Sequence, residues 1–330
     1  MAFEHGATSS PPPPRQMLCL LTFAAVVREA YQEMVGQATG LSSTNDERAK
    51  AVATYLGVLV NRLADYGSAF CRWIGQTEAV ADTFARHALA MLWDFAELCP
   101  FGLAGSNAQS ILNSQIDAVR SIDVSTSPAW VWRGSATALS TELRDLDAVI
   151  TDPPYYDNIQ YAALSDFFYV WIRRTIGHLY SEHVSTELSP KKNEAVASPW
   201  RHKSKLESRR AYEQMMAKSF SEANRVLKPG GQMTVVYAHK TTLGWSTLVY
   251  ALRRAGFTVT EAWPLDTERP GRLREHSSAA LASSIFLVAR KREGASTGSY
   301  EDEVRPELEK IVRERVDSLW KMGITGADLV

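Results

Sequence analysis

The stretch that decides the fold reads DAVITDPPYYDN and spans residues 147–158. Its first five residues are mostly apolar, which predicts a strand buried in a parallel sheet. The strand then ends in a carboxylate, two prolines and two aromatic residues. Because ligands bind beyond the carboxyl ends of strands in open α/β sheets, we expect a site at Asp152–Tyr155.

Alternating strands and helices around this stretch predict an open, mostly parallel α/β sheet over residues 128–292, with Val149 and Ile150 in an interior strand. Lys228–Gly231 has the proline and glycines of a tight turn. The other strands are expected at 129–133, 232–237, 257–263 and 284–289, and the helices at about 211–226 and 245–255.

Residues 1–15 are rich in Ser and Pro, which predicts a disordered segment. Residues 16–127 have apolar side chains at three- and four-residue steps, which predicts a helical region that packs as a separate layer. Within it, one helix starts near Arg15, a second run continues through Phe70 and Trp73, and a third covers about 79–95. The tail 293–330 is expected to be helical, with an amphipathic helix from Glu301.

Composition narrows the class of protein. The formal net charge of −1 does not indicate a nucleic-acid partner, so any basic surface must be local. Three cysteines fit neither a zinc site nor a disulfide framework, and no metal is expected. The N-terminus lacks the apolar core of a signal peptide, and the apolar run 17–27 is too short to span a bilayer. We therefore expect a cytoplasmic protein with no membrane partner.

The residue types of Asp152–Tyr155 suit transfer of a methyl group to the amino nitrogen of a base. That nitrogen is a poor nucleophile, because its lone pair is delocalised into the ring. Asp152 can accept a hydrogen bond from one N–H, and a backbone carbonyl held by the prolines can accept from the other. Tyr155 offers a stacking face for a base turned out of the duplex. The alternative is an ordinary Asp-Pro turn after a strand.

The motif resembles the Asp/Asn-Pro-Pro-Tyr motif of amino-methyltransferases. The longer runs 151–161 and 164–171 resemble the adenine-specific DNA methylases whose full-length members carry an N-terminal domain of unknown function and a zinc ribbon. Residues 23–30, 228–231 and 279–285 are also similar to that family, so the resemblance covers most of 15–330. It implies part of a Rossmann-like class I methyltransferase sheet with an N-terminal helical region, S-adenosylmethionine as cofactor and DNA as substrate. Asp before Pro-Pro favours N6 of adenine over N4 of cytosine.

The resemblance also assigns roles to individual residues. The catalytic loop is Asp152, Pro153, Pro154 and Tyr155, and the cofactor contacts are Ser135, Ala136 and Asp152. Ser135 and Ala136 follow a predicted strand, although such a turn is common. His239 follows another strand and is more often structural in that position. The substrate contacts are Tyr155, Tyr156, Asn158, Lys191, Lys192, Arg201 and Lys203, of which the basic residues fit either phosphate contacts or a solvated loop.

A Gly-rich loop for the methionine end of the cofactor is expected after the first strand of such enzymes. The candidate upstream of Asp152 is Pro100–Ser106, which follows a predicted helix instead of a strand and is interpreted as a helix-terminating loop. In the family, the Gly-rich loop and the zinc ribbon precede the stretch that matches Arg15 onward. The chain is therefore expected to be a fragment or one half of a split enzyme, with a separate chain supplying the Gly-rich cofactor-binding half.

Two other functions remain open. The same loop can hold N2 of guanine, as in an RNA base methyltransferase, although no added RNA-binding module is visible. A third hypothesis is non-enzymatic: a catalytically inactive fragment that binds nucleic acid or a partner chain.

Overall fold

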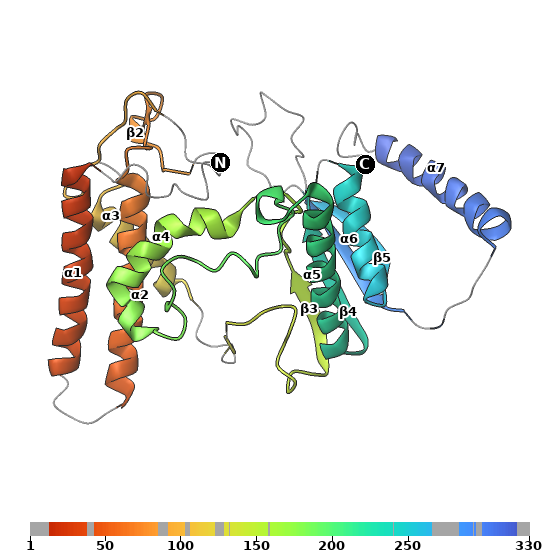
Figure 1. Cartoon of the computed structure of the whole chain (residues 1–330), viewed down its shortest axis with the longest axis horizontal. Helices are drawn as coiled ribbons and strands as arrows, with labels where there is room; N and C mark the ends of the chain where they lie inside the picture. The colour runs from red at the N-terminus through yellow and green to blue at the C-terminus, as the bar shows by residue number, and fades with distance from the viewer. Residues whose placement is uncertain are drawn as a thin grey trace. The chain divides into compact units, whose positions relative to one another are not determined.

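The computed structural model describes residues 13–37, 43–84, 92–102, 106–122, 129–131, 133–157, 159–239, 241–265, 284–292, 294 and 299–321. They fall into two compact units. We call residues 1–130 with 160–194 the helical unit, and residues 131–159 with 195–330 the sheet unit. Figure 1 labels helices and strands of both. The division differs from the linear boundaries expected from the sequence, because residues 160–194 group with the helices and not with the sheet.

The helical unit contains four α-helices within the described residues, and their apolar faces share one core. Two of these helices approach closely at Gly57, where a Cβ atom would lie 3.1 Å from Thr175 Oγ1 and 3.3 Å from a methyl carbon of Ile176. None of the described helices is both long and apolar enough to cross a bilayer. The helices are α1 (Pro14–Gln37), α2 (Ser43–Tyr66), α3 (Ala108–Arg120) and α4 (Tyr161–Ile176), and the short 3-10 helix η1 (Gly177–Leu179) follows α4.

Two predictions for the N-terminal region are corrected: where the first helix begins, and where the second helix ends. The expected disorder over 1–15 is wrong at Pro14, because proline suits the first turn of a helix and α1 begins there. Residues 1–12 lie outside the described residues. The second helix ends at Tyr66, before Phe70, and the strands β1 (Trp73–Ile74) and β2 (Ala79–Val80) form a small antiparallel hairpin.

The expected third helix over 79–95 is also wrong, for residues 79–84 and 92–95 are not helical and 85–91 lie outside the described residues. Buried polar side chains explain the loss of helix at its start. Thr83 donates its N–H and its hydroxyl to the Asp65 backbone carbonyl, at 3.0 and 2.6 Å, and its hydroxyl is 2.7 Å from Ser68 Oγ. These bonds hold Thr83 in a turn against the end of α2, and burial raises the pKa of the Asp65 carboxyl.

The turn at Pro100–Gly102 does not terminate a helix, as predicted, but leads into one. Asn107 caps α3, because its Oδ1 accepts the Ser110 N–H at 2.8 Å and its Nδ2 donates to the Gly102 carbonyl at 2.8 Å. Residues 103–105 lie outside the described residues. No described strand precedes this turn directly, so it lacks the context of a cofactor loop.

The sheet unit contains a mixed four-stranded sheet in the order β3-β4-β6-β5. The alternation of strands and helices is confirmed, but "mostly parallel" is wrong: β3 pairs parallel with β4, while β6 lies between β4 and β5 and is antiparallel to both. The reason is that β5 and β6, which follow one another among the described strands, pair antiparallel, and an antiparallel pair needs no crossover helix. The strands are β3 (Leu146–Thr151), β4 (Leu227–Tyr237), β5 (Phe257–Leu265) and β6 (Ser284–Lys291).

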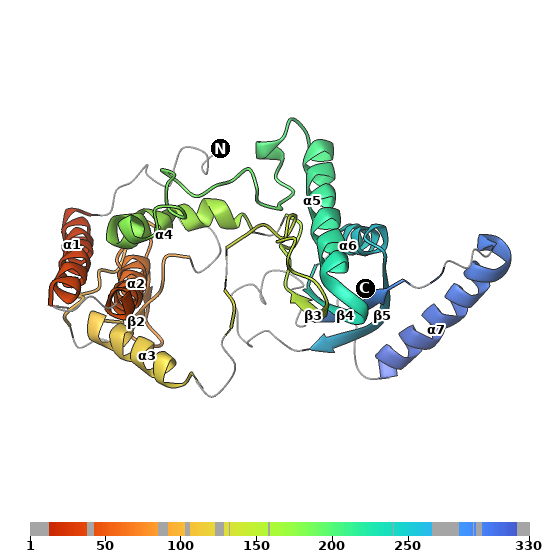
Figure 2. The same cartoon turned by 90° about the horizontal axis from the view of Figure 1, so that it is seen from below.

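Two helices pack on the same face of the sheet, as Figures 1 and 2 show. α5 (Lys205–Val226) starts at Ser204, whose side chain accepts the Glu207 N–H, and a 3-10 helix η2 (Pro199–Arg201) precedes it. α6 (Thr242–Arg254) starts at Thr241, whose side chain accepts the Gly244 N–H in the same way. Their apolar side chains, among them Tyr212, Phe220, Leu248 and Leu252, bury Met233, Val235 and Tyr237 of β4.

Two further predictions for the sheet region are corrected. Residues 129–131 and 133 form no strand, and Trp130 and Val131 are exposed. Val149 and Ile150 lie on an edge strand instead of an interior one, because β3 pairs only with β4 among the described strands. The predicted turn at Lys228–Gly231 is in keeping with a register shift in the pairing of β3 and β4, although these residues fall within the bounds of β4. Gly230 has a φ of 76° there, a conformation that glycine adopts without strain.

The C-terminal tail contains the π-helical turn η3 (Tyr300–Val304) and α7 (Arg305–Lys321), as its apolar spacing predicts. Pro306 lies in the first turn of α7, a position in which helices tolerate proline. No side chain of α7 is buried.

The close contact at Gly57 gives a stability prediction. Gly57→Leu should lower the urea midpoint of unfolding, because overpacking a helix contact costs about 1–3 kcal/mol. Gly36→Leu is the control, since Gly36 lies on α1 with nothing within 4 Å of its Cβ position. Its midpoint should be unchanged or higher, since leucine favours helix over glycine. Equal midpoints for both variants would contradict the tight α2–α4 contact.

Candidate active site

The Asp152–Tyr155 loop starts directly after β3, as the sequence predicts. Thr151, the last residue of β3, lies beside Val235 of β4 in the parallel pair. The loop therefore lies next to the carboxyl end of β4, which carries Tyr237 and then His239. The Asp152 side chain is exposed, Pro153 is buried, and Pro154 and Tyr155 are half-buried. A carboxylate thus faces solvent from a loop whose prolines are anchored.

Tyr212 of α5 fixes the conformation of this loop. Its hydroxyl donates to the Pro154 carbonyl at 2.7 Å and lies 3.2 Å from the Tyr156 backbone nitrogen, whose N–H it accepts. Tyr212 is only 1% exposed, and burial raises the pKa of its phenol, so the hydroxyl keeps its proton. Tyr156 has a φ of 49°, a left-handed conformation that a non-glycine residue adopts only when its surroundings hold it there.

The two backbone carbonyls of the proline pair differ in their partners. The Pro154 carbonyl accepts from Tyr212 and also from the Tyr156 N–H at 3.1 Å. The Pro153 carbonyl has no hydrogen bond to any part of the chain that the structure describes. Of the two proline carbonyls, that of Pro154 is therefore the one that holds the loop.

Aromatic rings surround the loop on the sheet side. The Tyr155 ring packs edge-on against Tyr237, with centroids 5.2 Å apart and an interplanar angle of 74°. Tyr156 packs in the same manner against Tyr212 at 5.3 Å and against His239 at 5.8 Å. Burial raises the pKa of Tyr237. These contacts fix the ring planes of both loop tyrosines.

His239 is held firmly at the end of β4, in keeping with its structural interpretation. Its Nδ1 accepts the Thr241 N–H at 3.2 Å. That Nε2 is buried and lies 3.8 Å from Asp157 Oδ1. Gly244 is required beside it, because a Cβ there would lie 2.2 Å from His239 Nδ1. The imidazole thus supports the loop from the side of β4.

Tyr156, at the end of the loop, is hydrogen-bonded to the segment that begins at Ala195, where the chain returns to the sheet unit. The Tyr156 carbonyl accepts the Ala197 N–H at 2.9 Å, and Val196, Ala197 and Ser198 are all buried. Asn158, a predicted substrate contact, lies outside the described residues. The loop from Asp152 to Tyr156 is therefore bound to β3, to α5 and to residue 197.

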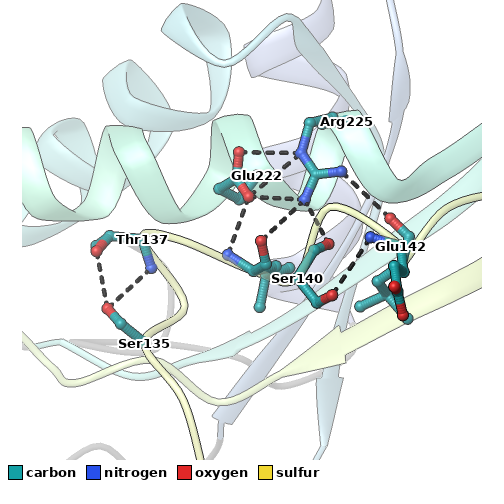
Figure 3. A network of polar contacts seen from close by, with 8 residues as sticks. Ser135, Thr137, Ser140, Glu142, Glu222 and Arg225 are labelled. Atoms are coloured by element: carbon teal, nitrogen blue, oxygen red, sulfur yellow. Dashed lines mark hydrogen bonds and ion pairs between the residues drawn. The ribbon is translucent and has the colours of Figure 1, made fainter.

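The predicted cofactor contacts Ser135 and Ala136 lie in a turn before β3, closed by a bridge between Ser135 and Ala138. Figure 3 shows this turn and the network that holds the following residues. Ser135 Oγ is 2.8 Å from Thr137 Oγ1, in an exposed contact. The turn follows an irregular segment, because the strand expected at 129–133 does not form.

Glu222 and Arg225 of α5 hold the chain between this turn and β3. Glu222 accepts the Leu139 N–H at 3.0 Å, and Arg225 donates to the carbonyls of Leu139, Ser140 and Leu143 at 3.1–3.3 Å. The hydrogen bond between the two side chains lowers the pKa of Glu222 and raises that of Arg225. A Glu and an Arg three residues apart on a helix could have been predicted to form an ion pair. The spacing does not indicate that this pair also binds the segment from Leu139 to Leu143.

The predicted basic substrate contacts do not form one cluster within a unit. Lys191 and Lys192 belong to the helical unit, and Arg201 and Lys203 belong to the sheet unit. Lys191 lies 2.6 Å from the buried carboxylate of Asp166, which also accepts the Ser189 N–H at 2.9 Å. This ion pair fastens the segment after α4 to that helix. Lys192 and Lys203 are exposed, and Arg201 is half-buried.

Comparisons with known proteins complete the description. No protein-family profile and no curated protein sequence matches the chain. One solved structure that resembles it is a provisionally named DNA modification methylase from Thermus thermophilus, at 19% identity and a TM-score of 0.22. The match covers 36% of this chain and 52% of that one, so the chain spans about half the length of the protein it matches. A likeness of this size does not assign a function.

The Tyr212 contacts give a prediction for the site. Tyr212→Phe keeps the ring but removes both hydrogen bonds to the loop, so the Tyr156 amide should exchange faster with deuterium. Leaving the Pro154 carbonyl with a weaker partner should destabilise the protein by about 1–3 kcal/mol. Tyr250→Phe is the control, because Tyr250 is exposed on α6. Unchanged exchange at Tyr156 in the Tyr212 variant would show that the phenol does not hold the loop.

Proposed function

We propose that this chain carries the catalytic loop of an S-adenosylmethionine-dependent DNA amino-methyltransferase that acts on N6 of adenine. One observation carries the proposal: the Asp152–Tyr155 loop directly follows a strand that is parallel to its neighbour, with an exposed carboxylate on a loop held by Tyr212. Ligands of α/β sheets bind at this edge. We also propose that the complete sheet is Rossmann-like.

Two acceptors on the loop are suited to the two N–H groups of an exocyclic amine. Asp152 offers an exposed carboxylate, and Pro153 offers the carbonyl that remains after Tyr212 and Tyr156 have taken the Pro154 carbonyl. Positive charge grows on the amino nitrogen as its bond to the methyl carbon forms. Acceptors aimed at that nitrogen stabilise this charge, and a charge-assisted hydrogen bond of this kind contributes roughly 1.5–3 kcal/mol.

The rigidity of the loop contributes to the same step. The prolines restrict the backbone, and Tyr212 joins Pro154 to Tyr156. Acceptors that are already in place need no reorganisation when charge develops, which is the main source of electrostatic catalysis. Tyr155 would stack on a base turned out of the duplex, with its ring plane set by the edge contact to Tyr237.

The described residues fit the cofactor only in part. When bound, S-adenosylmethionine supplies an electrophilic methyl group on sulfur. Ser135 and Ala136 lie on a turn whose continuation is held by Glu222 and Arg225. However, no described strand of the sheet unit is followed by a Gly-rich loop that could approach the methionine end. The complete cofactor site therefore needs residues beyond those described.

DNA is proposed as the substrate from the motif, with Arg201, Lys192 and Lys203 as phosphate contacts. Adenine is favoured over cytosine by the resemblance of the Asp-Pro-Pro-Tyr run alone. The RNA methyltransferase hypothesis has no observation of its own in its favour. The incomplete cofactor site is also consistent with a subunit that binds DNA or a partner without turnover. The two experiments that follow distinguish such a subunit from an enzyme.

The incomplete cofactor fit gives a binding prediction. The isolated chain should bind S-adenosylmethionine weakly or not at all by calorimetric titration, and affinity should appear when a polypeptide with the Gly-rich loop is added. Micromolar binding by the chain alone would mean that its own residues form the whole cofactor site.

The catalytic prediction concerns Asp152 in the assembled enzyme. Asp152→Ala should lower single-turnover transfer of labelled methyl to adenine-containing DNA by about 10²–10³-fold. Cofactor affinity should change little, because the interaction forms with the charge of the transition state. Glu142→Ala is the control, since Glu142 is an exposed carboxylate of the same unit. Wild-type turnover in the Asp152 variant would exclude the catalytic role and leave the binding subunit as the better hypothesis.

A further inference from the structure

The helix α7 carries an apolar row that is not buried. Apolar residues recur at every fourth position, so they lie one above the other along the helix. Val312, in the middle of the row, is 49% exposed, Trp320 at its end is 65% exposed, and no side chain of α7 is buried. Large apolar side chains gathered on a surface are typical of an interaction site. The row consists of Val304, Leu308, Val312, Val316 and Trp320.

The length of α7 also indicates that this row has a partner. The helix has 17 residues, only slightly more than the roughly 12–15 below which isolated helices are marginal in water. Its pairs of Arg305 with Glu301 and Glu309 are exposed and contribute little. Helices in proteins are stabilised mainly by packing of an apolar face. We therefore expect a surface that covers the row.

The charges along this segment are unevenly distributed. Residues 300–309 include five acidic residues and one basic residue, whereas residues 310–321 include four basic and two acidic ones. Two such segments attract each other when they are antiparallel, because the acidic half of each lies beside the basic half of the other. A parallel pair would bring like charges together, which is unfavourable. The surface of α7 is thus complementary to itself in the antiparallel orientation.

Two individual charges fit the same arrangement. Glu309 and Arg313 each follow a residue of the row by one position, so they lie on the same flank of it. A twofold axis near Val312 would bring Glu309 of each helix close to Arg313 of the other. The same axis would place Leu308 opposite Val316 of the other helix, which keeps apolar side chains together.

We propose that the apolar row of α7 is a dimer interface, on which α7 of a second copy of this chain packs antiparallel. Both copies use the same surface, as a twofold axis requires. The row from 304 to 320 is about 24 Å long. Such an interface is small, so the dimer is reversible. The proposal is independent of the proposed function, because it uses no residue of the Asp152–Tyr155 loop.

Sedimentation velocity of the full chain over a concentration series measures the dimer. Wild type should change from monomer to dimer as its concentration rises. Val312→Glu should raise the dissociation constant about tenfold or more, because it buries a charge beside the twofold axis. Val58→Glu is the matched control, since Val58 is a 46% exposed valine of α2, and it should dimerise like wild type. Circular dichroism shows whether the variants are folded.

A charge exchange tests the orientation of the two helices. Arg313→Glu should weaken the dimer, because it places two carboxylates at each contact with Glu309. Glu309→Arg combined with Arg313→Glu restores opposite charges and should restore the wild-type dissociation constant. In a parallel pair residue 313 would face its own copy, and the single variant would make little difference.

A wild-type chain that stays monomeric throughout the series would overturn the inference. So would a dimer that Val312→Glu leaves intact, or that Val58→Glu disrupts while the variant is folded. A double charge variant that remains as weak as Arg313→Glu would exclude the antiparallel orientation. If wild type is a monomer and Val312→Glu lowers its urea midpoint, α7 packs on its own chain and the inference is wrong.

Discussion

The hydroxyl group of Tyr212 is the constraint on which the candidate site depends. One buried phenol both donates to the Pro154 carbonyl and accepts the Tyr156 N–H, so it joins the loop after β3 to the helix that covers the sheet. A buried hydroxyl has one proton and two lone pairs, and the loop uses the proton and one lone pair. The position of Asp152 is thereby tied to the core under α5, because the loop cannot move without leaving polar groups unpaired.

The two faces of the sheet differ in how well they are packed. Its covered face is a closed core of α5, α6 and the strands, while no described helix of the sheet unit belongs to the core of its other face. The polar contacts follow the same division. Glu222 and Arg225 on the covered side hold the segment that leads into β3, and His239 and Ala197 hold the loop that leaves it. The Asp152–Tyr155 loop is thus fixed from the covered side of the sheet.

The sequence was sufficient for the features that depend on local patterns. The apolar run before Asp152 predicts β3, and the loop position of Asp152 follows from the end of that run. The two helices on the sheet were predicted as well, but they begin earlier than 211 and 245, where Ser204 and Thr241 cap them. Prediction failed where the local structure depends on contacts between residues that are far apart in the sequence. Thr83 leaves the helical pattern because Asp65 and Ser68 bind it, and the edge position of β3 depends on which strands are its neighbours. Tyr212 had no signal either, because its partners are backbone atoms of Pro154 and Tyr156.

The hydrogen bond between the Tyr156 carbonyl and the Ala197 N–H has a consequence for how this chain can vary in length. It brings together the two points where the chain leaves the sheet unit and returns to it, so the excursion between them is a closed loop. The entropy of closing a flexible loop grows only with the logarithm of its length. Insertions in the exposed parts of this excursion, such as residues 181–183, would therefore change the free energy of folding little and leave Asp152 in place.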